Sequence, residues 1–208
     1  MFTRSDKEYE EMTQKDIEKA GAKIACKDKS KLLKFLNVFI RIFNKRFMTE
    51  YVNVIGSTVW FPKEADFKNV DKKWLYCFMK HELHHVTSTK KKTTPGMILY
   101  YGFPQSLFLL FVPTAIVCGI ILGFCSLPVY VLAGLAVLSL FPWPAPFRVD
   151  EEVAAEVDSE LARIEEGVKS GKENLFNNVC SFEYYNPMYK KEWAREKFEK
   201  LLDEKLDS

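Results

Sequence analysis

The 208-residue chain has few histidines and no patterned cysteines. Its three histidines all lie within one pentapeptide, His81 to His85. The five cysteines are scattered without a Cys-x-x-Cys spacing, which argues against a disulfide framework and favours a reducing compartment. The opening segment is polar and lacks the apolar centre of a secretory signal, so we do not expect one.

Charge is missing from a long central segment. Residues 93–147 contain no charged side chain and no histidine. Residues 1–92 carry eight more basic than acidic residues, whereas residues 148–208 carry six more acidic than basic ones. The basic residues are spread through predicted helices without a recognised nucleic-acid module, so we do not expect a nucleic acid as a partner.

Two helices are predicted before the first strand. Residues 5–24 are charged and compatible with a helix, and we treat 1–28 as an N-terminal helix or tail that precedes a main domain at 29–208. Residues 31–47 form a basic amphipathic helix, which either packs on its own domain or lies on an anionic membrane surface. Its apolar positions recur at helical spacing: Leu32, Leu33, Leu36, Phe39, Ile40 and Phe43.

A short β-hairpin or small sheet is predicted next. Residues 51–55 and 57–61 are β-branched and aromatic runs separated by Gly56, and Pro62 ends the second run. Asp71 is a candidate N-cap for a helix that continues to about residue 88.

The uncharged segment predicts an apolar helical hairpin at 97–147. Residues 104–124 are long enough to cross a hydrocarbon core of about 30 Å, and residues 128–140 form a shorter second helix. We predict that the hairpin is transmembrane, with both ends on one side. The alternatives are a hairpin buried in protein and a re-entrant loop.

The C-terminal part is again helical. Residues 150–167 predict an acidic helix, residues 174–186 a connection, and Asn186-Pro187 the start of a last helix that ends at Leu206. The fold class that follows is α+β: a mostly helical domain with a small sheet and an inserted apolar helical hairpin.

The histidine-rich pentapeptide is the motif that carries chemistry. His81-Glu82-Leu83-His84-His85 fits His-Glu-x-x-His. On a helix, positions i and i+4 share a face, so His81 and His85 can both bind one Zn²⁺. Glu82 then lies beside the metal as the general base that deprotonates a zinc-bound water. The alternative is a solvated helix face, and His84 is not needed by the motif.

A catalytic zinc site needs a third protein ligand, and no histidine is left to supply it. Glu152 is the favoured candidate, because it begins a Glu-x-x-Ala-Glu sequence directly after the apolar segment. Glu156, one turn later, could orient one of the ligating histidines. Glu151 is the alternative in register and Asp158 a weaker one, and all four could instead be solvated charges on an acidic helix.

The order of these segments predicts a location. Glu152 follows His85 by 67 positions, and over that stretch the chain must return to the side it left, which a hairpin does and a single crossing does not. Positive charge at Lys90–Lys92 and Arg148 flanks the apolar segment. Since positive charge favours the cytoplasmic side, we expect a membrane-associated protein with its site on that side.

The order of motifs resembles two known groups. The sequence is similar to the membrane-embedded gluzincin metalloproteases, in which His-Glu-x-x-His is followed by an apolar segment and then by Glu-x-x-Ala-Asp. Glu156 stands where those proteases have Asp. A family of metallopeptidases encoded by tailed bacteriophages is closer in size. Its resemblance rests on FNKRFMTEYVNVIGSTVWFP at 43–62, HELHH at 81–85, RVDEEVAAE at 148–156 and the YYNPMYKKEWAREKFEKLLDE tail.

These resemblances imply a zincin-like fold and a phage origin. They also imply that the strand Thr58-Val59-Trp60 pairs with an extended substrate, and that Tyr184 or Tyr185 assists an oxyanion.

The function predicted from the sequence is a zinc-dependent metallopeptidase acting on a protein or peptide substrate. Its expected partners are that substrate, membrane lipid and other phage proteins. The alternative is a non-enzymatic phage or host membrane protein, either an anchor or a virion component that inserts into the bilayer. In that protein the metal site would be structural or vestigial.

Overall fold

Helices make up most of the fold, and the computed structural model describes residues 4–41, 45–103, 105–139, 146–179 and 191–207. The mostly helical α+β class predicted from the sequence is confirmed. The helices are α1 (Asp6–Ala20), α2 (Lys31–Ile40), α3 (Glu64–Lys68), α4 (Lys72–Lys92), α5 (Thr94–Gly102), α6 (Phe108–Leu122), α7 (Leu127–Ser139), α8 (Pro146–Glu166), α9 (Lys172–Val179) and α10 (Lys191–Leu206), with short 3-10 turns η1 (Lys27–Lys29) and η2 (Gln105–Leu107).

Three short strands form one mixed sheet in the order β1-β3-β2. β2 (Asn53–Ile55) and β3 (Thr58–Phe61) are the predicted hairpin, and Gly56 permits the turn between them with a φ of +63°. β1 (Lys23–Cys26), which the sequence did not predict, pairs parallel to β3 on its other side. β3 is therefore the middle strand, and β2 lies at an edge.

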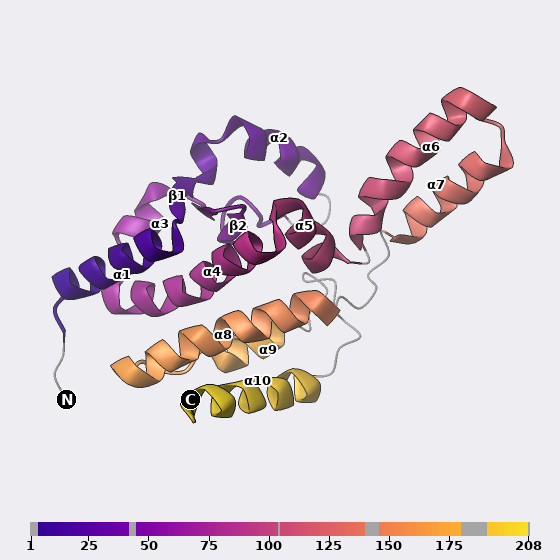
Figure 1. Ribbon diagram of the computed structural model, residues 1–208. Coiled ribbons are helices and arrows are strands. Elements are labelled where there is room, and N and C mark those ends of the chain that lie inside the picture. The colour runs from indigo at the N-terminus through magenta and orange to yellow at the C-terminus, as the bar shows by residue number, and fades with distance from the viewer. Residues whose placement is uncertain (1–3, 42–44, 104, 140–145, 180–190, 208) are drawn as a thin grey trace.

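The long helix α4 forms the centre of the fold (Figure 1). It begins at Asp71, whose carboxylate accepts a hydrogen bond from the backbone N–H of Trp74 at 2.7 Å, as predicted for an N-cap. The sheet and α1 pack on one side of α4, and α8 packs on another. The core between the sheet, α1 and α4 consists of Ile17, Val59, Phe61, Leu75, Met79, Leu83 and Val86.

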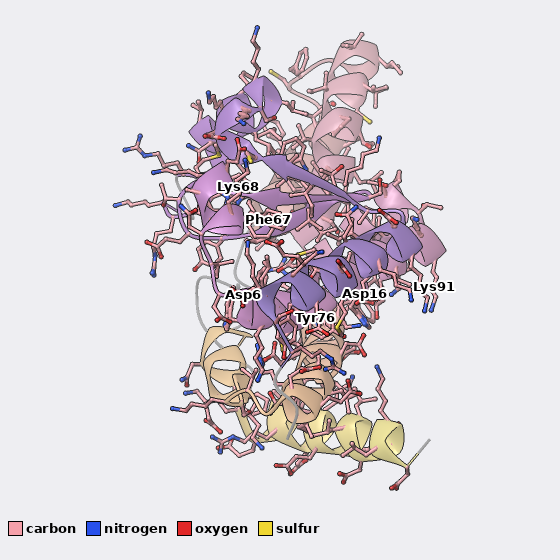
Figure 2. The ribbon with its side chains drawn as sticks, turned by 90° about the vertical axis from the view of Figure 1, so that its left-hand side faces the viewer. Asp6, Asp16, Phe67, Lys68, Tyr76 and Lys91 are labelled. Atoms are coloured by element: carbon pink, nitrogen blue, oxygen red, sulfur yellow. The ribbon has the colours of Figure 1, made fainter. Side chains whose placement is uncertain are left out.

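Residues 6–26 belong to this core. α1 starts with a capping box between Ser5 and Glu8 and packs along α4. Figure 2 shows this arrangement, with Asp16 on α1 and Tyr76 on α4. Lys80 of α4 pairs with Asp16 at 2.6 Å, and β1 continues directly from α1 into the sheet.

A second core fixes the orientation of α8. Val149, Val153 and Val157 recur every four residues and are fully buried against Phe176 of α9 and Phe198 of α10. Because this stripe points away from α4, the acidic residues on another face of α8 are directed toward it. The hydroxyl of Ser159 donates to the Cys77 carbonyl of α4 at 3.0 Å, which ties the two helices together.

The apolar segment forms the predicted helical hairpin but not a transmembrane one. α6 and α7 pack against each other and project from the rest of the fold (Figure 1). α6 has 15 residues and α7 has 13, whereas crossing a bilayer takes about 20. Among the described residues, no helix is both long and apolar enough to cross a membrane, so the transmembrane prediction is wrong.

The remaining helices differ from the predictions in their bounds. α2 ends at Ile40, and Leu32 and Leu36 of its predicted apolar stripe are exposed while Leu33 is buried. α9 occupies the start of the segment predicted as a connection. The predicted start of the last helix at Asn186-Pro187 lies outside the described residues, as do Tyr184 and Tyr185.

Candidate metal centre

His81 and His85 lie one turn apart on α4 and turn their rings toward a common point. Their Nε2 atoms are 3.3 Å apart, and their ring planes are inclined at 75°. His85 is 9% exposed, and the side chain of His81 is 14% exposed. The spacing follows from the 3.6-residue period of the helix, and the aromatic and apolar start of α4 keeps this part of the helix inside the fold.

Glu152 of α8 completes the group. Its Oε2 lies 3.3 Å from His81 Nε2, and its Oε1 lies 3.7 Å from His85 Nε2. The three side chains can each offer one ligand atom within 4.8 Å of the others. The structure thus brings together the three residues that the sequence analysis proposed as metal ligands.

The donor set and its spacing fit zinc. Two imidazole nitrogens and one carboxylate oxygen are ordinary zinc ligands, and three protein ligands leave one position open. A tetrahedral ion with bonds of about 2.0–2.1 Å keeps its ligand atoms about 3.3 Å apart. Two of the three separations match this value. The Nδ1 atom of His85 is buried without a hydrogen-bond partner among the described residues, so no group there orients the ring through Nδ1.

The other candidate acids have different partners. Glu151 pairs with Lys92, and its Oε2 lies 3.8 Å from His84 Nε2. Asp158 Oδ2 lies 2.7 Å from His84 Nδ1. Glu156 Oε2 lies 3.1 Å from His81 Nδ1, which is the orienting contact predicted for it. The alternative of solvated charges is wrong for Glu151, Glu152 and Glu156, since each is 5–6% exposed.

The contact with Glu156 selects the useful tautomer of His81. If His81 donates from Nδ1–H to Glu156, the lone pair of Nε2 is left for a metal. Tyr101 of α5 acts on the other side, because its hydroxyl donates to Glu152 Oε1. Its ring also meets that of His85 edge-on at 6.2 Å. Sequence reasoning missed Tyr101, and no pattern in the apolar segment marks it.

Without a metal, the site keeps its charges paired. Burial opposes protonation of His81, but hydrogen bonds to Glu152 and Glu156 outweigh it and raise the pKa of His81 to about 10. Burial lowers the pKa of His85 to about 4. The pKa of Glu152 falls to about 2 because the attraction of the two histidines exceeds the effect of burial. Metal binding therefore has to displace a proton from His81.

Glu82 follows His81 on α4 and is 6% exposed. Burial raises the pKa of Glu82 to about 7, with His81 opposing and Glu152 reinforcing the shift. A carboxyl group with a pKa near neutrality can accept and release a proton in the same reaction cycle. Its position beside the candidate ligands is the one that the motif predicts for a general base.

Two hollows meet at this site. One of about 500 Å³ is walled by β2, α5 and Leu36 of α2, and the other, of about 1180 Å³, lies toward Trp74, Phe78 and the turn after α8. His81, Glu82 and Glu152 line both, as do Tyr51 and Val52, which precede β2. His81 and Glu152 therefore face both hollows, and His85 faces the smaller one.

The edge strand at this cleft is β2. The prediction that Thr58–Trp60 pairs with a substrate is wrong, because these residues belong to β3, whose two sides are occupied by β1 and β2. Asn53, Val54 and Ile55 of β2 line the smaller hollow.

No protein-family model, curated protein or solved structure matches this chain. The resemblance to phage metallopeptidases and to gluzincins is therefore not tested by relatives. Nothing found supports the predicted phage origin or place in a virion.

Proposed function

We propose that this chain is a zinc-dependent metallopeptidase with His81, His85 and Glu152 as metal ligands and Glu82 as the general base. The observation that carries the proposal is the convergence of two histidine Nε2 atoms and a carboxylate from another helix at 3.3–3.7 Å. A buried glutamate with a raised pKa stands beside them. Such a group of ligands, base and cleft is more specific than the five-residue motif alone.

Each residue has a defined task in this proposal. Zinc, when bound, polarises the peptide carbonyl and lowers the pKa of a water molecule to about 7. Glu82 accepts the proton of the attacking water and passes it to the leaving amine nitrogen. Glu156 holds the orientation of His81, and Tyr101 holds that of Glu152.

The cleft supports an extended peptide as the substrate. β2 offers an edge to which a peptide backbone can add by β-strand pairing. The two hollows then receive the residues on either side of the bond to be cleaved. A cleft open on both sides favours cleavage within a chain over removal of a terminal residue.

The test compares the purified wild-type chain with Glu82→Gln, His85→Ala and the control Glu199→Gln, which changes an exposed glutamate of α10. Bound zinc and cleavage of an unfolded, fluorescently labelled protein are both measured. We expect Glu82→Gln to keep zinc and lose about 10²–10⁴-fold in cleavage rate, His85→Ala to lose zinc, and the control to match the wild type.

Two results would overturn the proposal. If the wild-type protein binds no zinc, the proposed metal site is absent. If cleavage persists in Glu82→Gln or with a chelator present, this mechanism is excluded. Stoichiometric zinc with no cleavage of any unfolded protein would instead favour the alternative of a structural metal site.

A further inference from the structure

Arg163 of α8 has contacts that the proposed reaction does not use. Its Nη1 donates to Glu156 Oε1 and lies 3.3 Å from Glu160 Oε2. All three residues are buried, with exposed fractions of 5–8%. A buried guanidinium between two carboxylates of its own helix is costly to desolvate, so the arrangement invites a functional explanation.

The two oxygens of Glu156 have separate partners. Oε2 faces His81 Nδ1 at 3.1 Å, and Oε1 accepts from Arg163. A carboxylate held at one oxygen by a guanidinium cannot turn freely about its last bond. It therefore keeps presenting the other oxygen to the Nδ1–H of His81, and His81 keeps its Nε2 directed toward Glu152.

The guanidinium is itself held by the turn between α8 and α9. A Cβ atom at Gly171 would lie 2.6 Å from Arg163 Nη1 and 2.8 Å from its Cζ, so only glycine leaves room for the guanidinium there. The backbone N–H of Gly171 donates to Glu160 Oε2 at 3.4 Å, and the Val168 N–H donates to the Arg163 carbonyl at 2.8 Å. The turn thus closes on Arg163.

We propose that Arg163 is a positioning residue of the metal centre, which acts through Glu156 on the orientation of His81 and is kept in place by the turn at Gly171. The inference rests on the proposed zinc site and adds a residue that orients the carboxylate behind one of its ligands. Groups that orient metal ligands typically change metal affinity by about 10–100-fold when removed.

The experiment uses Arg163→Met, Arg163→Lys and Gly171→Ala in the full chain. Arg195→Met is the matched control, because it removes the same side chain from an exposed ion pair with Glu173 on the surface. Zinc affinity is measured by competition with a chromophoric chelator. The visible absorption of the Co²⁺-loaded protein reports the ligand geometry, and thermal unfolding without metal reports stability.

We expect Arg163→Met to bind zinc about 10–100-fold more weakly and to change the Co²⁺ spectrum. Arg163→Lys should recover part of the affinity, since an ammonium group can still pair with Glu156. Gly171→Ala should displace the guanidinium without removing its charge and shift the spectrum in the same direction. Arg195→Met should match the wild type in both measurements.

Unchanged zinc affinity and an unchanged Co²⁺ spectrum in Arg163→Met would overturn the positioning role. If that variant does not fold, the same result in both Arg163→Lys and Gly171→Ala would overturn it. These outcomes differ from failure of the proposed function, in which the wild-type chain itself binds neither zinc nor cobalt.

Discussion

Replacing Lys27 with methionine tests how the wall of the cleft is held. Lys27 is fully buried, and its Nζ donates to the Phe47 carbonyl at 2.5 Å, to the Tyr51 carbonyl at 2.6 Å and to the side chain of Asn53. These acceptors belong to the segment that enters β2, and Tyr51 lines both hollows. Methionine fills a similar volume but cannot donate a hydrogen bond.

Two opposing effects set the size of the change. Each acceptor left without a donor costs about 1–3 kcal/mol, which gives about 3–9 kcal/mol for three. Burial lowers the pKa of Lys27 from 10.5 to about 8, against the attraction of Glu82. That lowering corresponds to about 3 kcal/mol of charge burial that methionine relieves. We therefore expect a net loss of about 3 kcal/mol in the free energy of unfolding, or roughly 6–12 °C in Tm.

The pH dependence gives an independent signature. Between pH 8 and 10.5, the unfolded chain keeps a proton on Lys27 that the folded chain has released. Because the unfolded state then binds more protons, the contribution of this residue to the unfolding free energy rises with pH, by up to about 3 kcal/mol. The methionine variant lacks this rise, so the difference between the two proteins grows with pH across that window.

Urea unfolding on both sides of pH 8 measures both effects, with Lys34→Met on the exposed face of α2 as the control. The control should follow the wild-type curve at every pH. The reasoning is refuted if Lys27→Met unfolds at the wild-type urea concentration at neutral pH. It is also refuted if the two proteins differ by a constant amount at all pH values.

Two further predictions concern packing and partners. Phe198→Ala empties a fully buried position against Val153 and should lower the free energy of unfolding in urea by about 3–5 kcal/mol. Because the same core orients Glu152, zinc affinity should fall as well. A variant as stable as the wild type would contradict this prediction. Leu32 and Phe35 are 66% and 63% exposed on α2. If membrane lipid is a partner, replacing both with serine should abolish cosedimentation of the protein with anionic vesicles. Wild-type protein that stays in the supernatant would count against that partner.

The local parts of the site could be predicted from the sequence. The spacing of His81 and His85 depends only on the helical period, and Asp71 marks the start of that helix by its own capping bond. Glu152 was reached because the chain offers no further histidine and because an acidic helix follows the apolar segment. These inferences need no knowledge of how distant elements pack.

The contacts between distant elements could not be predicted. Tyr101 contacts the site from a segment whose pattern indicates only an apolar helix. Lys27 holds the wall of the cleft from a segment whose pattern indicates only a charged turn. Arg163 lies seven residues after Glu156 and so on the same face of α8, which is a signal that could have been used. The four residues of β1 are too few to show an alternating pattern, and so β3 could not be recognised as the middle strand.

Whether the apolar hairpin is needed to bring Glu152 to the two histidines can be tested. The sequence predicts that the hairpin brings Glu152 back to the histidines by two membrane crossings. In the structure, the two ends of the hairpin are already held together by other contacts. Tyr100 of α5 stacks on Phe147 of α8 with ring centroids 4.6 Å apart, and Arg148 Nε donates to the Tyr101 carbonyl at 3.2 Å.

The hairpin itself adds little to this junction. α6 and α7 pack mainly on each other and on η2, and Ile120, Ile121 and Leu127 are 72–75% exposed. We therefore expect that replacing residues 104–145 with a short Gly/Ser linker leaves zinc affinity and the Co²⁺ spectrum unchanged, because α5 and α8 still meet through their own side chains. Linkers of two lengths separate strain in the connection from loss of the hairpin. Loss of metal binding with both linkers, in a protein whose remaining helices are still formed, would show that the hairpin positions α8 after all.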